Sequence, residues 1–491
     1  MANTRKAGNK TKRSRGSLKS ASQPAQTSQK PLPDEESPHA EQPTASRYQN
    51  FAKLALRRAE GDFVMLPCTL RGNARRLHVR QTLREDHVQR IYRRRSEAND
   101  KFSKLCGSAY AFFRGTSLLF YRDMAGEDAW MPTVLTLGDV HPENFGVMPS
   151  ADNTPIFGVN DFDEAYYAPF TWDLKRGAVG FLIAAKEHGL KKKYRRKTAK
   201  ALVKGYLKGI AAFAKDDNER DVQVRIDNSP KLIRKLLENA RRNRERWLEK
   251  YLGPKREGFI ASKDVVPLTS RIDEFQKLVT QYRKDNVSEP PARAGDFSVK
   301  DVAEKKGSGT ASLGLPRYYV LIEGLNADGT DDYILEMKQA RRSALAGLAP
   351  PSQYQEDGEA DRVVNAQAVH LVGGDPFYGK VEVNERSFLV RERSPYKHEI
   401  DLSDLSKDEW YEYALICGRS LAQAHALTDD SGAVKGDIEP RILDAVGNQK
   451  LFICDILDFA LEAACRLYRD HTTFASDYKL GAYETIDVIY D

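Results

Sequence analysis

The chain has 491 residues, which is too long for one ordinary hydrophobic core, so two or three structural units are expected. Its hydrophobic content of 41%, with 22 tyrosines and 20 phenylalanines, is typical of a globular protein. The net charge of +7 is small for this length and favours anionic partners only weakly. The five cysteines are scattered and form no C-x-x-C pair, which argues against a disulfide framework or a zinc site and for a reducing compartment.

The N-terminal segment, residues 1–46, is poor in apolar residues, and seven basic residues between Arg5 and Lys19 precede the first acidic one. Such a segment cannot bury enough surface to offset its ordering entropy, so we predict a disordered basic tail. Nucleic acid could bind only through this tail. No apolar stretch reaches the ~20 residues of a membrane helix, and no apolar signal region is visible. We therefore expect a cytoplasmic protein without a membrane partner.

The region from Tyr48 to Tyr121 has a mostly helical pattern. Within it, Ala109–Gly115 is aromatic and contains Arg114. An arginine in apolar surroundings usually has an anionic partner, which here is either a structural carboxylate or a bound phosphate. Short strands are expected at Pro132–Leu137 and Ile156–Val159, separated by a turn-rich segment.

An acidic stretch follows these two strands, reading GDVHPENFG over Gly138–Gly146 and NDFDEA over Asn160–Ala165. Removing so many acidic groups from water is costly unless a cation or hydrogen-bond donors compensate. The stretch is therefore either a well-solvated surface or a metal-assisted active site. Beyond it, Phe170–Asp173 is expected to begin a helix, with Asp173 as a plausible cap.

The second half of the chain begins with a change of composition around Asp285–Asp296, which predicts a boundary. We expect a helix at Val363–Leu371 and helices at the C-terminus. Strands are predicted at Ser298–Ala303, Arg317–Glu323, Asp332–Met337 and Ser387–Arg393. The expected regions are a tail (1–46), a helical lobe (47–290), a β-rich lobe (291–395) and C-terminal helices that complete the helical lobe (396–491).

Phosphoryl transfer requires a carboxylate for the attacking hydroxyl, hard oxygen ligands for Mg²⁺, a cation for the phosphates and a glycine-rich turn. Asp139 and Asn144 have the separation of the aspartate and asparagine in a kinase catalytic loop. Asp161 ends the following strand. The glycine-rich segment 307–314 and Lys338 in a later strand supply the remaining parts.

Several segments resemble the DUF2252 family of uncharacterised bacterial proteins over most of residues 50–470. They are GDVHPENFG, NDFDEA, Trp172–Arg176, Phe113–Gly115, and Gly309–Gly314 followed by Arg317-Tyr318-Tyr319. The first two are also similar to the H-G-D-x-x-x-x-N and I-D-F-D motifs of aminoglycoside phosphotransferases and related kinase-like folds. This resemblance implies that Asp139 is the catalytic base, Asn144 and Asp161 bind Mg²⁺, and Lys338 binds phosphate. It also implies that Asp173 braces the catalytic loop.

The order of these parts is inverted, because the glycine-rich loop and Lys338 follow the catalytic segment. A kinase-like site then requires a circular permutation, with the strand-rich lobe inserted between two parts of the helical lobe. Ala311 stands where protein kinases have a central glycine. The residue that pairs with Lys338 is open, with Glu359 and Gln367 as candidates.

We therefore predict an α+β (α/β) protein with a permuted, kinase-like, two-lobed fold, a large helical lobe and a small antiparallel β-rich lobe. The predicted reaction is phosphoryl transfer from ATP, with Mg²⁺, to a hydroxyl of a small molecule or protein. Asp139 is the predicted catalytic residue, and His141 and Asp173 support the loop. The predicted metal ligands are Asn144, Asp161 and Asp163, and the predicted ATP-binding residues are Gly307, Gly309, Ser312, Gly314, Lys338 and Arg114.

Two alternatives remain open. One is a metal-dependent phosphohydrolase, in which Asp139, His141, Glu143, Asp161 and Asp163 are all possible ligands. The other is a nucleotide-binding pseudokinase or adaptor without turnover. A second segment, Gly436–Arg441, echoes the start of GDVHPENFG, but Ile442 replaces the asparagine, so we interpret this echo as chance.

Overall fold

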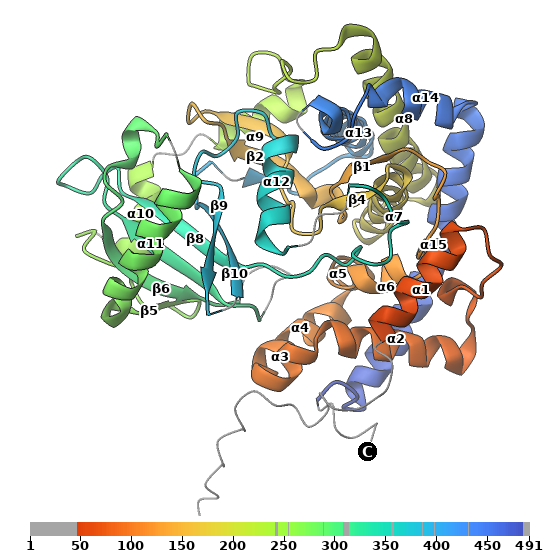
Figure 1. Cartoon of the computed structure of the whole chain (residues 1–491), viewed down its shortest axis with the longest axis horizontal. Helices are drawn as coiled ribbons and strands as arrows, with labels where there is room; N and C mark the ends of the chain where they lie inside the picture. The colour runs from red at the N-terminus through yellow and green to blue at the C-terminus, as the bar shows by residue number, and fades with distance from the viewer. Residues whose placement is uncertain are drawn as a thin grey trace, which may run out of the picture. The chain divides into compact units, whose positions relative to one another are not determined.

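The computed structural model describes residues 47–240, 244–253, 255–287, 289–307, 314–354, 358–384, 386–396, 398–430 and 432–484. The predicted tail and residues 308–313 of the glycine-rich loop, which include Gly309, Ala311 and Ser312, lie outside this range. The described chain combines helices with antiparallel sheets, which confirms the α+β class (Figure 1). Within these residues, no helix is both long and apolar enough to cross a membrane.

The α-helices fall before, within and after the region of the large sheet. Their bounds are α1 (Arg47–Ala59), α2 (Gly72–Asp86), α3 (Val88–Arg93), α4 (Arg95–Gly107), α5 (Ala109–Gly115), α6 (Ser117–Arg122), α7 (Thr171–Glu187), α8 (Lys192–Asp216), α9 (Lys231–Ala240), α10 (Arg244–Leu252), α11 (Ile272–Asn286), α12 (Ala360–His370), α13 (Lys407–Asp430), α14 (Ile438–Val446) and α15 (Gln449–Lys479).

The strands form three antiparallel sheets with the orders β1-β4, β11-β2-β3 and β5-β6-β7-β8-β10-β9. Their bounds are β1 (Thr133–Thr136), β2 (Phe145–Pro149), β3 (Pro155–Val159), β4 (Tyr166–Pro169), β5 (Val265–Pro267), β6 (Val299–Lys305), β7 (Arg317–Ile322), β8 (Tyr333–Gln339), β9 (Gly379–Val383), β10 (Arg386–Glu392) and β11 (His398–Glu399). The two small sheets carry the acidic stretch, because β1 runs into it and the β2–β3 hairpin separates its two parts.

Helices pack against both faces of the six-stranded sheet. Val320 and Ile322 of β7 share a core with α11, whereas their neighbours Tyr319 and Leu321 share another with α10. This alternation follows from the period of two in a strand, which turns successive side chains to opposite faces. The helices α10 and α11 therefore pack with the sheet, although they precede the change of composition near residue 290.

The helical core is centred on α7, α8 and α13, and α8 lies unusually close to α13. A Cβ atom added at Gly418 would lie 2.1 Å from the carbonyl oxygen of Leu202, and one added at Gly205 would lie 2.1 Å from that of Leu415. Each helix thus presents a glycine where the partner's backbone crosses it. Residues on both helices, including Leu202, Tyr206 and Leu421, are fully buried there.

Replacing Gly418 with alanine is expected to destabilise the protein by about 1–3 kcal/mol, because the methyl group can be accommodated only if the two backbones move apart. The measurement is the free energy of urea unfolding. Gly107→Ala, at the end of α4, is the control, since nothing lies within 4 Å of its added Cβ atom. Equal stability of the two variants would contradict the close crossing of α8 and α13.

Candidate functional site

A cavity of about 650 Å³ lies where the six-stranded sheet meets the acidic stretch. The acidic stretch lines it with Asp139, His141, Glu143, Asn144, Asn160, Asp161 and Asp163, and the sheet contributes Arg317, Tyr319, Glu336, Lys338, Arg391 and Arg393. Arg114 and Tyr251 also line it. The fold thus gathers most of the predicted site residues around one space. Gly307 and Gly314 adopt φ values of 70° and 85°, and Gly314 lies beside Glu97 and Arg90.

Lys338 of the sheet contacts the acidic stretch directly. Its ammonium group donates a hydrogen bond to the carboxylate of Asp163, which lies 175 positions earlier in the chain. Burial alone would raise the pKa of Asp163, but the Lys338 charge lowers it below its ordinary value. Asp163 is therefore the partner of Lys338. Glu359 instead accepts a hydrogen bond from the backbone of Arg342, and Gln367 lines a different cavity.

Asp139 is held by an ion pair with Arg176. The Nε atom of Arg176 lies 2.8 Å from Oδ1 of Asp139, and the guanidinium is fully buried between aromatic rings, 4.2 Å from the Phe113 centroid. Burial raises the pKa of Asp139 to about 6, and Arg176 limits that rise. Its carboxylate is thus mostly ionised at neutral pH yet accepts a proton more readily than an exposed aspartate.

His141 lies beside Asp139, with Nε2 3.8 Å from its Oδ2 atom. The backbone N–H of Glu143 donates to His141 Nδ1 at 3.2 Å, which leaves the ring proton on Nε2, facing Asp139. Burial holds the His141 pKa well below its ordinary value, so the imidazole is neutral. Its position suits orientation of the loop by hydrogen bonding.

Asp173 braces the loop from the first turn of α7. Its carboxylate accepts hydrogen bonds from the backbone N–H groups of Leu137, at 2.7 Å, and Gly138, at 3.0 Å. The expectation that it caps its own helix was wrong: Phe170 occupies the N-cap position and makes no side-chain cap bond. Gly138 has a φ of 76°, and a Cβ atom there would lie 2.2 Å from the Glu164 carbonyl oxygen, so only glycine fits.

Two further residues, His425 and Tyr206, hold Asp173 in place through a chain of hydrogen bonds. His425 Nε2 on α13 lies 3.2 Å from Asp173 Oδ2, and the Tyr206 hydroxyl on α8 lies 2.9 Å from His425 Nδ1. All three side chains are fully buried. Sequence reasoning missed both residues, because a single histidine on an apolar helix face carries no local signal that distinguishes a brace from an ordinary core residue.

Asn144 and Asp161 offer oxygen ligands at the cavity wall. Asn144 ends a 3-10 turn, Pro142–Asn144, and its amide nitrogen donates to the carbonyl oxygen of Asp139. Asp161 Oδ1 accepts from the backbone N–H of Asp163 at 3.2 Å. Mg²⁺ is commonly held by one or two protein oxygens together with substrate phosphates, so this pair fits that ion. Asp163, predicted as a third ligand, is engaged by Lys338.

Arg114 pairs with Glu143, since its Nη1 atom lies 2.7 Å from Oε2 of that residue. The anionic partner of the embedded arginine is therefore a carboxylate of the acidic stretch. Its Nε atom is buried and, among the described residues, has no hydrogen-bond partner; the same holds for Nδ2 of Asn160. Both of these residues line the cavity, where a ligand oxygen could satisfy them.

An ion network on the sheet was also missed by sequence reasoning. Glu336, almost fully buried on β8, lies 3.1 Å from Arg317 Nη1 and 2.7 Å from Arg391 Nη2. These pairs depend on the register, in which Arg317 faces Lys338 and Arg391 faces Glu336 on neighbouring strands. The network makes the sheet side of the cavity strongly polar, which suits a phosphate-bearing ligand.

The chain was also compared with known proteins. The profile of the family described as "Uncharacterized protein conserved in bacteria (DUF2252)" matches residues 93–477, which is most of the chain. Searches of curated proteins and of solved structures returned no match. The matched range includes the acidic stretch, the six-stranded sheet, Lys338 and the bracing residues Tyr206 and His425. The protein therefore belongs to the DUF2252 family.

Proposed function

We propose that this protein is an ATP- and Mg²⁺-dependent phosphotransferase that acts on a hydroxyl acceptor. One observation carries the proposal: Lys338, from the sheet, pairs with Asp163. This pair lies at the cavity wall that Asp139, Asn144 and Asp161 also form. A lysine for phosphates, an aspartate base and oxygen ligands for a metal are the parts that phosphoryl transfer requires.

The proposed roles follow from the chemistry of each group. Asp139, with its pKa of about 6, accepts the proton of the attacking hydroxyl. Asn144 and Asp161 hold Mg²⁺, which neutralises phosphate charge when bound. Lys338 binds phosphate oxygens, and Asp163 keeps the ammonium group at the cavity wall. Arg176 and Asp173 position the loop.

The architecture we propose is a kinase-like, two-lobed fold in permuted order. The strands β6 and β7 flank the glycine-rich segment, β8 carries Lys338, and α12 follows before β9 and β10. This is the order in which a kinase presents its glycine-rich loop, its lysine strand and the helix after it. The segment lies between α8 and α13, which pack on each other, as an inserted lobe requires.

The test is Mg²⁺-dependent binding of ATP by the whole protein. Asp161→Ala and Lys338→Ala are each expected to weaken ATP affinity by about 10-fold or more, the loss of one charge-assisted contact. Asp444→Ala and Lys450→Ala change exposed residues outside the cavity and serve as matched controls. The proposal fails if both site variants bind ATP as well as wild type.

Assays of turnover distinguish a kinase from a phosphohydrolase and from a pseudokinase. Transfer of the γ-phosphoryl group to a member of an acceptor screen supports a kinase. Hydrolysis of a simple phosphate ester without nucleotide, activated by Mn²⁺ or Zn²⁺, would indicate a phosphohydrolase instead. Mg²⁺-dependent ATP binding without any turnover would indicate a pseudokinase.

A further inference from the structure

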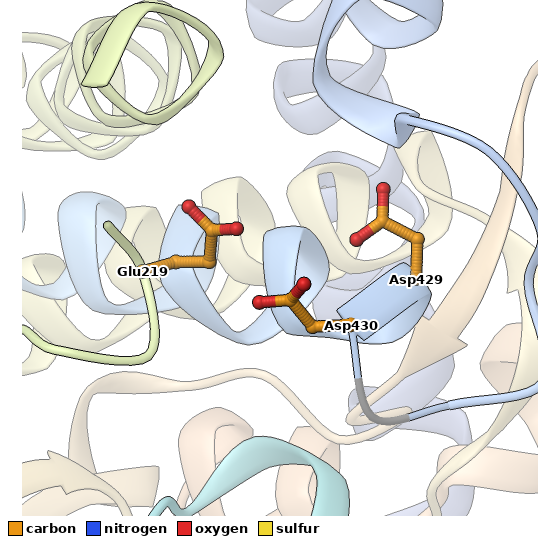
Figure 2. A group of neighbouring side chains, drawn as sticks. All are labelled: Glu219, Asp429 and Asp430. Carbon is orange, nitrogen blue, oxygen red and sulfur yellow. The ribbon is translucent and has the colours of Figure 1, made fainter. Parts of the chain in front are cut away.

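A second group of carboxylates lies at the C-terminal end of α13, outside the cavity. It contains Glu219 from the loop after α8, Asp429 and Asp430 from α13, and Asp437 and Glu439 at the start of α14. One oxygen from each of Glu219, Asp429 and Asp430 lies within 4.8 Å of the others, and the same holds for Asp429, Asp437 and Glu439. Figure 2 shows Glu219 reaching toward the two aspartates at the helix end.

Two of these carboxylates are buried and only partly hydrogen-bonded, since Glu219 bonds to Asp430 and Glu439 bonds to Asp437. Glu219 is 3% exposed and Glu439 is 4% exposed. Among the described residues, Oε2 of Glu219 and Oε1 of Glu439 have no hydrogen-bond partner. An unpaired carboxylate oxygen removed from water is unfavourable unless a cation or a hydrogen-bond donor compensates it.

The neighbouring charges do not supply that compensation. In the part of the chain that the structure describes, no lysine or arginine forms an ion pair with any of the five carboxylates. Burial and, to a smaller extent, nearby carboxylates together raise the pKa of Glu219 to about 7 and that of Asp429 to about 6. Burial likewise raises the pKa of Glu439 to about 9. A bound cation would remove this repulsion.

We propose that these five residues, called the α13 acidic cluster, bind a divalent cation of the Ca²⁺ class. All of the proposed ligand atoms are carboxylate oxygens, which are hard donors. Zn²⁺ prefers nitrogen and sulfur ligands, so this set of ligands does not favour it. Ca²⁺ accepts several carboxylates in irregular geometry, whereas Mg²⁺ requires a near-octahedral shell and retains water. Asp429 belongs to both groups of three and is the shared ligand.

The cation would join three segments that are distant in sequence. Gln423 of α13 already ties down the loop that carries Glu219, because its Nε2 atom donates to the carbonyl oxygens of Glu219 at 2.7 Å and Val222 at 2.6 Å. Asp429 lies one helical turn after His425, which contacts Asp173. The cation therefore fixes the end of the helix that supports the Gly138 loop. This proposal does not depend on the phosphotransferase proposal.

The test uses the full chain with Asp161→Asn, so that the cavity does not contribute to metal binding. Calorimetric titration with Ca²⁺ alone is expected to give one saturable site, and Ca²⁺ in excess should raise Tm by about 2–4 °C over EDTA. Asp429→Asn and Glu219→Gln, added separately, are expected to weaken Ca²⁺ binding by 10-fold or more. Asp444→Asn, on the exposed side of α14, is the control and should bind like the parent.

A second measurement separates metal binding from damage to the fold. In the metal-free protein the Glu219 carboxylate lies within 4.8 Å of those of Asp429 and Asp430, with no cation between them. Glu219→Gln is therefore expected to have a higher Tm than the parent in EDTA and a lower Tm in Ca²⁺. Absence of Ca²⁺ binding by the parent, or equal binding by Asp429→Asn, would overturn the proposal. Neither readout involves nucleotide, so the phosphotransferase proposal stands or fails separately.

Discussion

Replacing Asp139 with asparagine is expected to lower the rate of the proposed phosphoryl transfer by about 10²–10⁴-fold, the usual contribution of a general base. The amide can still accept a hydrogen bond from Arg176, so the loop keeps its support, but it cannot take a proton from the attacking hydroxyl. The measurement is kcat with ATP, Mg²⁺ and the acceptor from the screen, together with ATP affinity. Affinity should change little, because Asp139 is not among the groups assigned to ATP or the metal.

The pH dependence provides a control on this role. The proposed base works in its ionised form, so kcat/KM should be constant above about pH 7 and should fall tenfold per pH unit well below the Asp139 pKa of about 6. Glu143→Gln removes another carboxylate that lines the cavity and should leave this acidic limb in place. If Asp139→Asn retained near-normal kcat with the same limb, Asp139 would not be the base.

Replacing Asp173 with alanine is expected to cost about 3–5 kcal/mol of unfolding free energy, the usual range for removal of one member of a buried charged network. The change leaves the N–H groups of Leu137 and Gly138, as well as His425 Nε2, without their acceptor in a site that excludes water. Urea unfolding followed by circular dichroism measures the loss. A loss of this size is a large part of the stability of an ordinary domain.

Asp173→Asn is the matched variant for this prediction. It preserves the shape of the side chain and one acceptor oxygen, so it should cost less than alanine, about 1–3 kcal/mol. The backbone N–H groups would then share that oxygen. The Gly138 loop should be positioned less precisely, and the rate of the proposed transfer should fall. Equal urea midpoints for wild type and the alanine variant would show that Asp173 does not support the loop.

The sequence was most informative where the pattern is local. The strands β6, β7, β8 and β10 were predicted within two residues of their ends, because each is six or seven residues long and β7, β8 and β10 contain continuous aromatic or aliphatic runs. The strands β2 and β4 were missed, since each is short, ends in proline and is buried along its whole length. A five-residue run such as Phe145–Pro149, with a glycine inside it and a proline at its end, resembles a loop as much as a strand.

The site was harder to predict, because its contacts join distant parts of the chain. Residue types and spacing led to the prediction of Asp139, Asn144 and Asp161, which line one cavity, but they did not indicate that Asp163 pairs with Lys338. Asp161 and Asp163 lie two positions apart and have the same side chain, so the sequence does not distinguish their roles. The approach of β8 to the acidic stretch in the folded chain does. The pairing of Asp173 with His425, 252 positions later, depends in the same way on tertiary packing.

The close crossing of α8 and α13 has a consequence for biosynthesis. Lys192–Asp216 leaves the ribosome well before Lys407–Asp430, because the whole sheet-bearing segment is made between them. Until α13 arrives, the face of α8 that surrounds Gly205 has no partner, and the backbone contact at Gly418 cannot form. Completion of the helical core therefore waits for nearly the whole chain, and a nascent chain that stops before Lys407 leaves an apolar helix face exposed to solvent.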